Sequence, residues 1–136
     1  MNIPQALIEV LDITLAGFQK ENESFLISVF YKHEELLQIV NQNMLNDKSI
    51  QKSTFGLVLV ICFDKKIDTE PLNRFEHSHF KFDSIKGENF EPDIVEYFLP
   101  LEIKSEKAAK TICKFLKKIF HIKSTKHLSF QFYEVE

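Results

Sequence analysis

The segment Thr54–Phe63, TFGLVLVICF, is the feature that most constrains the fold of this chain. Its residues are almost all apolar, and many are β-branched or aromatic types that favour strands. A strand that is apolar on both faces must be covered on both faces, so the segment is expected to lie centrally in a sheet. It is about half as long as the roughly 18 apolar residues that a membrane-spanning helix requires.

Two amphipathic segments predict helices that cover such a sheet. In the first, apolar residues from Ile3 to Phe18 recur at helical spacing. Pro4 fits a first helical position, and the helix is expected to end near Gly17. The second begins with Ser105 as a candidate N-cap and ends near His121. Its buried stripe is expected to consist of Ala108, Ile112, Phe115, Leu116, Ile119 and Phe120.

The remaining strands are predicted from composition and alternation. Glu23–Tyr31 is rich in β-branched and aromatic residues and is interpreted as a strand, although one long helix running on to Met44 fits the spacing equally well. We expect a helix from His33 to about Leu45 after it. Further strands are expected at the following segments: Phe75–Phe82 (FEHSHFKF), Ile94–Ile103 and Leu128–Val135.

These elements predict a single α+β domain that covers residues 1–136. The expected sheet is mixed and mainly antiparallel, has four or five strands, and carries two or three packed helices in the order α(β)αβββαβ. Asn46–Ser53 and Asp64–Arg74 are interpreted as loops. Pro100 indicates an edge position or a bulge, and the last strand, helix and strand are long enough to form a parallel crossover.

Composition argues against several classes of function. The three glycines are far apart, whereas phosphate-binding loops need clustered glycines, so nucleotide sites of that kind are not expected. A single arginine, Arg74, weakens any interpretation based on nucleic-acid recognition. The two cysteines fit neither a disulfide framework nor a zinc motif, and no secretory signal is recognised at the N-terminus, so we expect a reduced, cytoplasmic protein without a cofactor.

The pair His77 and His79 is the strongest candidate for a metal site. In a strand, residues two apart point to the same face and can share one metal ion. No neighbouring motif supplies a third ligand, so half-exposed strand histidines are the favoured interpretation.

The two cysteines and a group of acidic residues are further candidates for a functional site. Cys62 is expected to be buried and inert, and Cys113 to pack against its helix, although nearby lysines could lower the pKa of its thiol. A cluster of acidic residues is interpreted as a solvated loop that can also steer a basic partner, and it consists of Glu88, Glu91, Asp93 and Glu96.

The distribution of charge along the chain is more unusual than any of its motifs. Lys104–Lys126 holds eight lysines and one glutamate, whereas the whole chain has a net charge of −3. Lys110, Lys114 and Lys117 lie opposite the predicted buried stripe. Such a face either binds an anionic partner or keeps the protein soluble, and solubility is the favoured interpretation.

The sequence therefore favours a non-catalytic protein-binding module of a bacterial immunity, chaperone or adaptor type, with a charge-polarised surface and a partner that is another protein. The alternative is a small enzyme or ligand-binding domain whose pocket would include His77, His79, Tyr97 and Cys113. A homo-oligomer is a third arrangement that the sequence leaves open.

Overall fold

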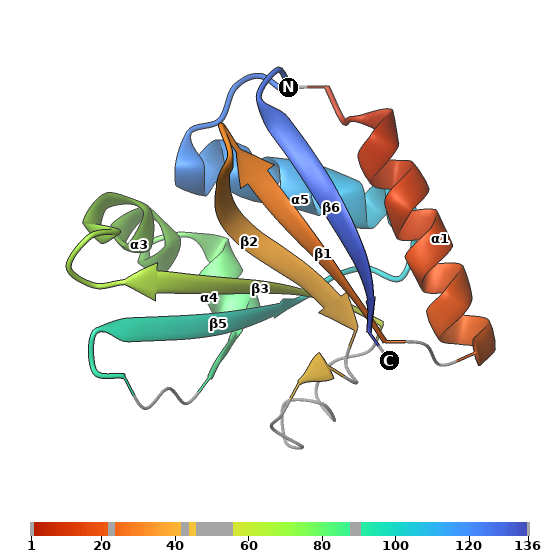
Figure 1. Cartoon of the computed structure of the whole chain (residues 1–136). Helices are drawn as coiled ribbons and strands as arrows, with labels where there is room; N and C mark the ends of the chain where they lie inside the picture. Colours follow the sequence, from red (N-terminus) through yellow and green to blue (C-terminus); the bar gives the residue numbers. More distant parts are fainter. Residues whose placement is uncertain (1, 22–23, 42–43, 46–55, 88–90, 136) are drawn as a thin grey trace.

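The apolar segment predicted from the sequence forms strand β3 (Leu57–Asp64), the third strand of a six-stranded antiparallel sheet (Figure 1). The structure is a computed structural model that describes residues 2–21, 24–41, 44–45, 56–87 and 91–135. The strand order is β4-β5-β3-β2-β1-β6. The other strands are β1 (Ser24–Tyr31), β2 (Glu34–Asn41), β4 (Ile85–Lys86), β5 (Ile94–Pro100) and β6 (Leu128–Val135).

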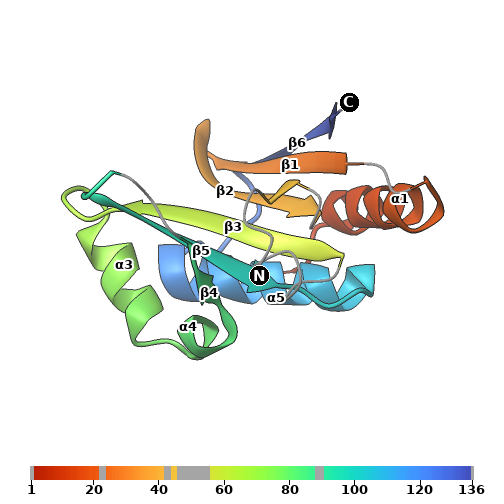
Figure 2. The same cartoon turned by 90° about the horizontal axis from the view of Figure 1, so that it is seen from below.

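Helices cover one face of this sheet. The described residues contain α1 (Gln5–Glu21), α3 (Thr69–Glu76), α4 (His79–Asp83) and α5 (Ser105–Phe120). Figure 2 shows α3, α4 and α5 on the same side of the sheet. Buried side chains of α1 and α5, such as Leu11 and Ile112, belong to the same core cluster as the inward-facing residues of β1, β2, β3 and β5.

The other face of the sheet has a smaller apolar cluster. Val40, Leu45, Val58 and Phe98 are buried there, and Val60 packs against them. The expectation that the β3 segment is apolar on both faces is therefore confirmed for most of its length, and it fails at Cys62, which is exposed. The predicted α+β class is confirmed, whereas six strands replace the four or five expected.

The predicted helix from His33 to Leu45 is wrong, because Glu34–Asn41 forms strand β2. A two-residue turn at Lys32 and His33 joins β1 to β2, and both residues have positive φ values, 51° and 69°. Positive φ at both central positions is characteristic of a type I′ hairpin turn, which usually contains Asn or Gly. Lys32 and His33 are not residues of that type, so no turn was predicted there. The strand predicted at Glu23–Tyr31 is confirmed as β1.

The predicted strand Phe75–Phe82 is also wrong. The chain forms α3 and α4 there, so part of the predicted loop Asp64–Arg74 is helical as well. The Ser78 hydroxyl donates a hydrogen bond to the Phe75 carbonyl oxygen at 2.7 Å, and this local bond separates the two helices. Phe75 and Phe80 are buried, but Phe82 is 87% exposed, so the apparent alternation does not correspond to two faces of a strand.

The predicted crossover through α5 joins β5 to β6, which run in the same direction in one sheet. The two strands are not neighbours, because β3, β2 and β1 lie between them, and every neighbouring pair is antiparallel. Pro100 is the last residue of β5 and lies beyond the short β4, so its missing N–H interrupts no ladder on that side. The predicted loop Asn46–Ser53 lies outside the described residues.

Candidate binding surface at the end of helix α5

Helix α5 keeps the amphipathic pattern that its sequence predicts. Ala108, Ile112, Phe115 and Ile119 are fully buried, whereas Lys110, Lys114 and Lys117 are exposed. The helix ends at His121, which has a φ of 56°, and the Ile122 N–H donates to the Leu116 carbonyl oxygen at 3.2 Å. The left-handed residue ends the helix, and the N–H groups of His121 and Ile122 satisfy the Leu116 carbonyl oxygen in its last turn.

Aromatic packing brings α3 and α4 against the second half of α5. The Phe115 ring lies 6.0 Å from the Phe75 ring and 5.1 Å from the Phe80 ring, measured between centroids. All three side chains are buried. Because His79 precedes Phe80 directly, this packing places an exposed imidazole beside the lysines of α5.

The result is a basic depression of about 570 Å³, lined by His79, Lys114, Lys117, Lys118 and His121. A smaller depression of about 330 Å³ adjoins it through Lys118 and also contains Arg74 and His77. The described lining of both depressions contains no carboxylate. We call the two together the basic surface, and its residues are Arg74, His77, His79, Lys114, Lys117, Lys118 and His121.

Arg74 has a structural role within the basic surface. Its Nε donates a hydrogen bond to the carbonyl oxygen of Ile119 at 2.7 Å, and its Nη1 lies 4.0 Å from a carboxylate oxygen of Glu70. The guanidinium therefore joins α3 to the last turn of α5, where a cation also interacts favourably with the helix dipole. Because Nε is occupied, only Nη1 and Nη2 remain for a ligand, and the Arg74 side chain is 27% exposed.

Phe82, the last residue of the strand expected at Phe75–Phe82, lies instead in helix α4. It is three positions after His79 in α4, a spacing that places the two side chains on neighbouring parts of the helix surface. Phe82 is 87% exposed, and it is not among the residues that line the basic depression. No local signal identified it, because its exposure follows from how α4 docks on α5.

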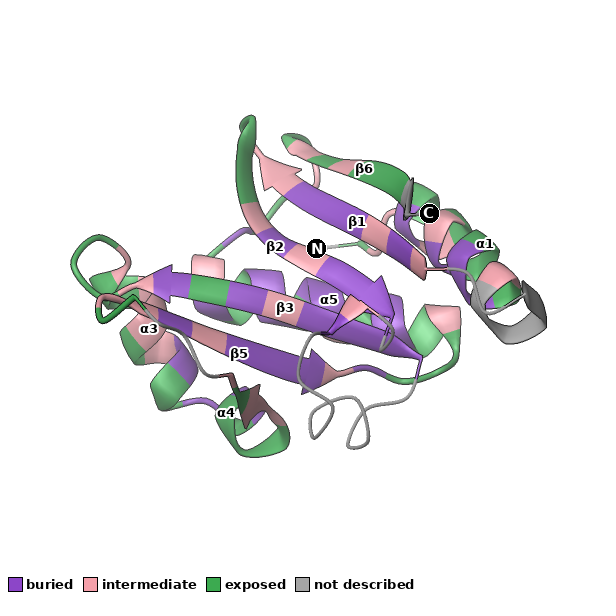
Figure 3. Cartoon of the chain, turned by 60° about the horizontal axis from the view of Figure 1, so that its bottom comes forward, coloured by how far each residue is buried: buried purple, intermediate pink, exposed green. Residues whose placement is uncertain are grey.

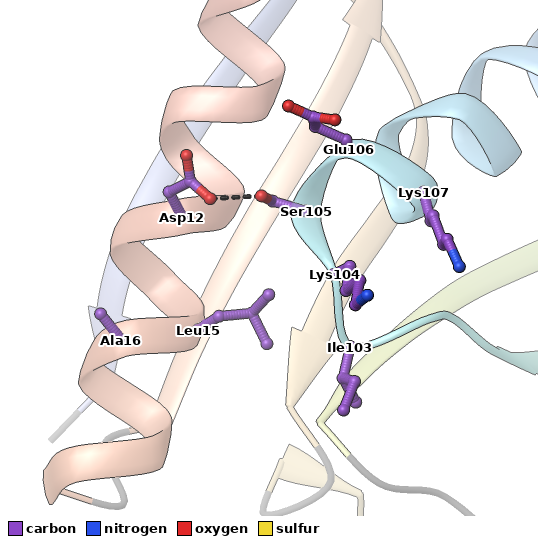
Figure 4. A pocket seen from close by; sticks show the side chains of 8 residues that line it. All are labelled: Asp12, Leu15, Ala16, Ile103, Lys104, Ser105, Glu106 and Lys107. Atoms are coloured by element: carbon purple, nitrogen blue, oxygen red, sulfur yellow. Dashed lines mark hydrogen bonds between the residues drawn. The ribbon is translucent and has the colours of Figure 1, made fainter.

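The first turn of α5 borders a groove of a different character (Figure 4). This groove has a volume of about 560 Å³, and its charged lining residues are Asp12, Lys104, Glu106 and Lys107. The Ser105 hydroxyl donates a hydrogen bond to the Asp12 carboxylate of α1. Ser105 is therefore not the N-cap, a position that Lys104 occupies without a side-chain hydrogen bond.

The described members of the predicted acidic cluster lie next to different groups. Glu88 lies outside the described residues, and Glu91 is exposed in the turn before β5. An Asp93 carboxylate oxygen lies 3.1 Å from Lys66 Nζ, whereas Glu96 accepts a hydrogen bond from the Cys62 thiol.

The histidine pair also differs from its prediction. His77 is the C-cap of α3 and its Nδ1 lies 2.8 Å from the Asn73 carbonyl oxygen, whereas His79 begins α4. The strand geometry on which a shared metal ion depended is therefore absent. Among the described residues, no group of three or more His, Cys, Asp or Glu side chains is arranged to hold a metal ion.

The other candidate reactive groups are not poised for catalysis. Partial shielding of the Cys62 thiol, followed by its hydrogen bond to Glu96, raises the thiol pKa to about 12. Burial also raises the pKa of Cys113, so the lowering effect expected from nearby lysines does not prevail. Tyr97 is 5% exposed, and its ring lies 4.6 Å from that of Phe75, in the core.

In the described part of the chain, no helix combines the length and apolar character needed to cross a membrane. Comparisons with protein-family models, with curated proteins and with solved structures find no match to this chain.

Proposed function

We propose that the protein is a non-catalytic binding module that recognises an acidic segment of another protein through its basic surface. The observation that carries the proposal is the convergence of Lys114, Lys117 and Lys118 with two histidines in one depression whose described lining contains no carboxylate. Three lysines at one concave site attract anions more strongly than the same charges spread over a helix. The partner is thus expected to be acidic, in contrast to the basic partner that the acidic residues suggested.

Two features favour an acidic protein over a nucleic acid. The guanidinium of Arg74 is bonded to the backbone of α5, so the remaining cations are lysines and histidines, which do not read phosphates bidentately. Phe82 offers an exposed aromatic ring of the type that anchors protein interfaces. A partner that places an apolar side chain on Phe82 and carboxylates over the lysines would match both features.

The positions of the catalytic candidates support a binding role. Tyr97 and Cys113 are buried in the core, whereas His77 and His79 are exposed and line different depressions. The alternative enzyme would need these groups around one substrate. They do not share such a pocket.

The proposal can be tested with two fluorescent peptides of equal charge. One contains glutamates separated by serines, and the other contains glutamates separated by leucines. Both should bind at low salt, and Lys114→Glu with Lys117→Glu should weaken binding by about tenfold or more, because each change replaces an attraction with a repulsion. Fluorescence anisotropy measures both affinities.

A matched control reverses the charge of two lysines at the other end of the same helix. Lys104→Glu with Lys107→Glu changes the net charge equally but alters the mixed groove, so peptide affinity should stay within about threefold. The leucine peptide should bind more tightly than the serine peptide, because its leucines can contact Phe82. Phe82→Ser should abolish this preference and leave the affinity for the serine peptide unchanged. Equal losses in the two lysine variants would refute a specific surface, and duplex DNA that binds more tightly than either peptide would refute a protein partner.

A further inference from the structure

Strand β6 forms one edge of the sheet. β6 pairs with β1 over eight residues without a register shift, and it ends the strand order on its side. In an antiparallel ladder, every second residue directs its N–H and C=O away from the neighbouring strand. No described strand pairs with that outer side, and Figure 3 shows much of β6 as exposed.

The two edges of the sheet differ in how they are protected. The edge opposite β6 is β4, which contains only Ile85 and Lys86, and the neighbouring β5 ends at Pro100. Short strands, lysine and proline are the usual means of blocking pairing between sheet edges. The sequence of β6, LSFQFYEV, contains no lysine, arginine, proline or glycine, so this long edge lacks those means.

Large side chains of β6 are exposed. Phe132 and Tyr133 are 40% and 44% exposed. An edge with large apolar side chains and unpaired backbone groups is a template for another strand.

We infer that β6 pairs antiparallel with β6 of a second copy of this chain, so that two sheets join into one. Charge identifies the second copy as the occupant. Lys126 and His127 precede the strand and Glu134 lies near its end, so antiparallel self-pairing brings the basic end of each strand to the acidic end of the other. Such complementarity is built into a two-fold interface.

The same argument selects a register. With Phe130 opposite Phe130 of the second copy, Leu128 lies opposite Phe132, Ser129 opposite Gln131, and Lys126 opposite Glu134. In this register, residues on the helix-covered face of one sheet lie opposite residues on the helix-covered face of the other. A two-fold axis perpendicular to the joined sheet requires this arrangement. It also buries Phe132 against an apolar side chain.

Two variants test both the interface and its register. Ser129 and Gln131 are exposed, so charges there do not disturb the monomer core. Ser129→Lys with Gln131→Lys places like charges opposite each other and should weaken dimerisation by about tenfold or more. Ser129→Lys with Gln131→Glu places opposite charges there and should leave the dimer within about threefold of the unaltered protein.

Sedimentation velocity over a concentration series provides the dimer dissociation constant for the full chain. Ile67→Lys with Ile103→Lys adds two charges to exposed positions away from β6 and should leave dimerisation unchanged. A monomeric mass at every concentration would overturn the inference, as would a dimer that tolerates the two-lysine variant. Loss of the dimer in both β6 variants would overturn the register.

Discussion

The two ends of helix α5 contain similar numbers of lysines but differ in what surrounds them. At the first turn, Lys104 and Lys107 share a groove with Asp12 and Glu106, so positive and negative charges alternate. At the last turns, Lys114, Lys117 and Lys118 share a depression with two histidines and with no carboxylate among the described lining. A lysine-rich sequence therefore does not by itself define an anion-binding site. The neighbouring elements decide whether its charge is compensated.

The largest expected effect comes from removing the aromatic contact that builds the basic end. Phe80 is 3% exposed and packs on Phe115, so Phe80→Ala should lower the free energy of unfolding by about 3 kcal/mol and displace His79. Urea denaturation measures this loss. Phe82→Ala, in the same short helix but 87% exposed, should cost less than about 0.5 kcal/mol. Similar losses in the two variants would contradict the docking of α4 described here.

The next effect concerns the contact between α3 and the end of α5. Arg74→Ala removes the charge-assisted hydrogen bond to Ile119 and should cost about 1.5 kcal/mol in the free energy of unfolding. Arg74→Lys keeps a cation near the helix terminus and should recover part of that loss. Guanidinium denaturation of both variants provides the comparison. An alanine variant as stable as the original protein would show that this bond is not needed.

A smaller gain is expected at the residue that terminates α5. His121 has a positive φ of 56°, a conformation that glycine adopts without steric cost, so His121→Gly should raise the free energy of unfolding by about 1 kcal/mol. Thermal denaturation measures this gain. His127→Gly serves as the control because His127 is not among the residues with positive φ. A gain of equal size in the control would contradict the explanation.

The smallest effect tests the two ends of the helix directly. Lys104 is the N-cap of α5 and makes no side-chain hydrogen bond there. Lys104→Asp should stabilise the protein by about 0.5 kcal/mol, because an aspartate can cap the helix and interacts favourably with its dipole. The gain is small because repulsion from Asp12 and Glu106 offsets part of it. Lys118→Asp makes the same change of charge in the last turn and should destabilise it by a similar amount. Chemical denaturation at low salt resolves the two signs. The same sign for both would show that the helix dipole is not the cause.

The acidic and basic residues proposed from the sequence also had different outcomes. Lys110, Lys114 and Lys117 are the lysines that the sequence offers as candidates for binding an anionic partner. Lys114 and Lys117 line one depression because a single helix holds them at neighbouring positions, whereas Lys110 is not among its lining residues. Asp93 and Glu96 are three residues apart, as Lys114 and Lys117 are, yet Asp93 lies beside Lys66 and Glu96 lies beside Cys62. Helical spacing keeps side chains together, whereas a turn and a strand send them in different directions.

Local pattern and composition by themselves determined the elements that could be predicted from the sequence: the helices α1 and α5 and the strands β1, β3, β5 and β6. Helical spacing of apolar residues predicted the two helices, and β-branched and aromatic composition or alternation predicted the four strands. The hairpin at Lys32 and His33, the helices that replace the strand expected at Phe75–Phe82, and the meeting of His79 with Lys114 were decided by the tertiary structure. They depend on strand pairing and aromatic packing between residues far apart in the chain, and these contacts outweigh weak local preferences.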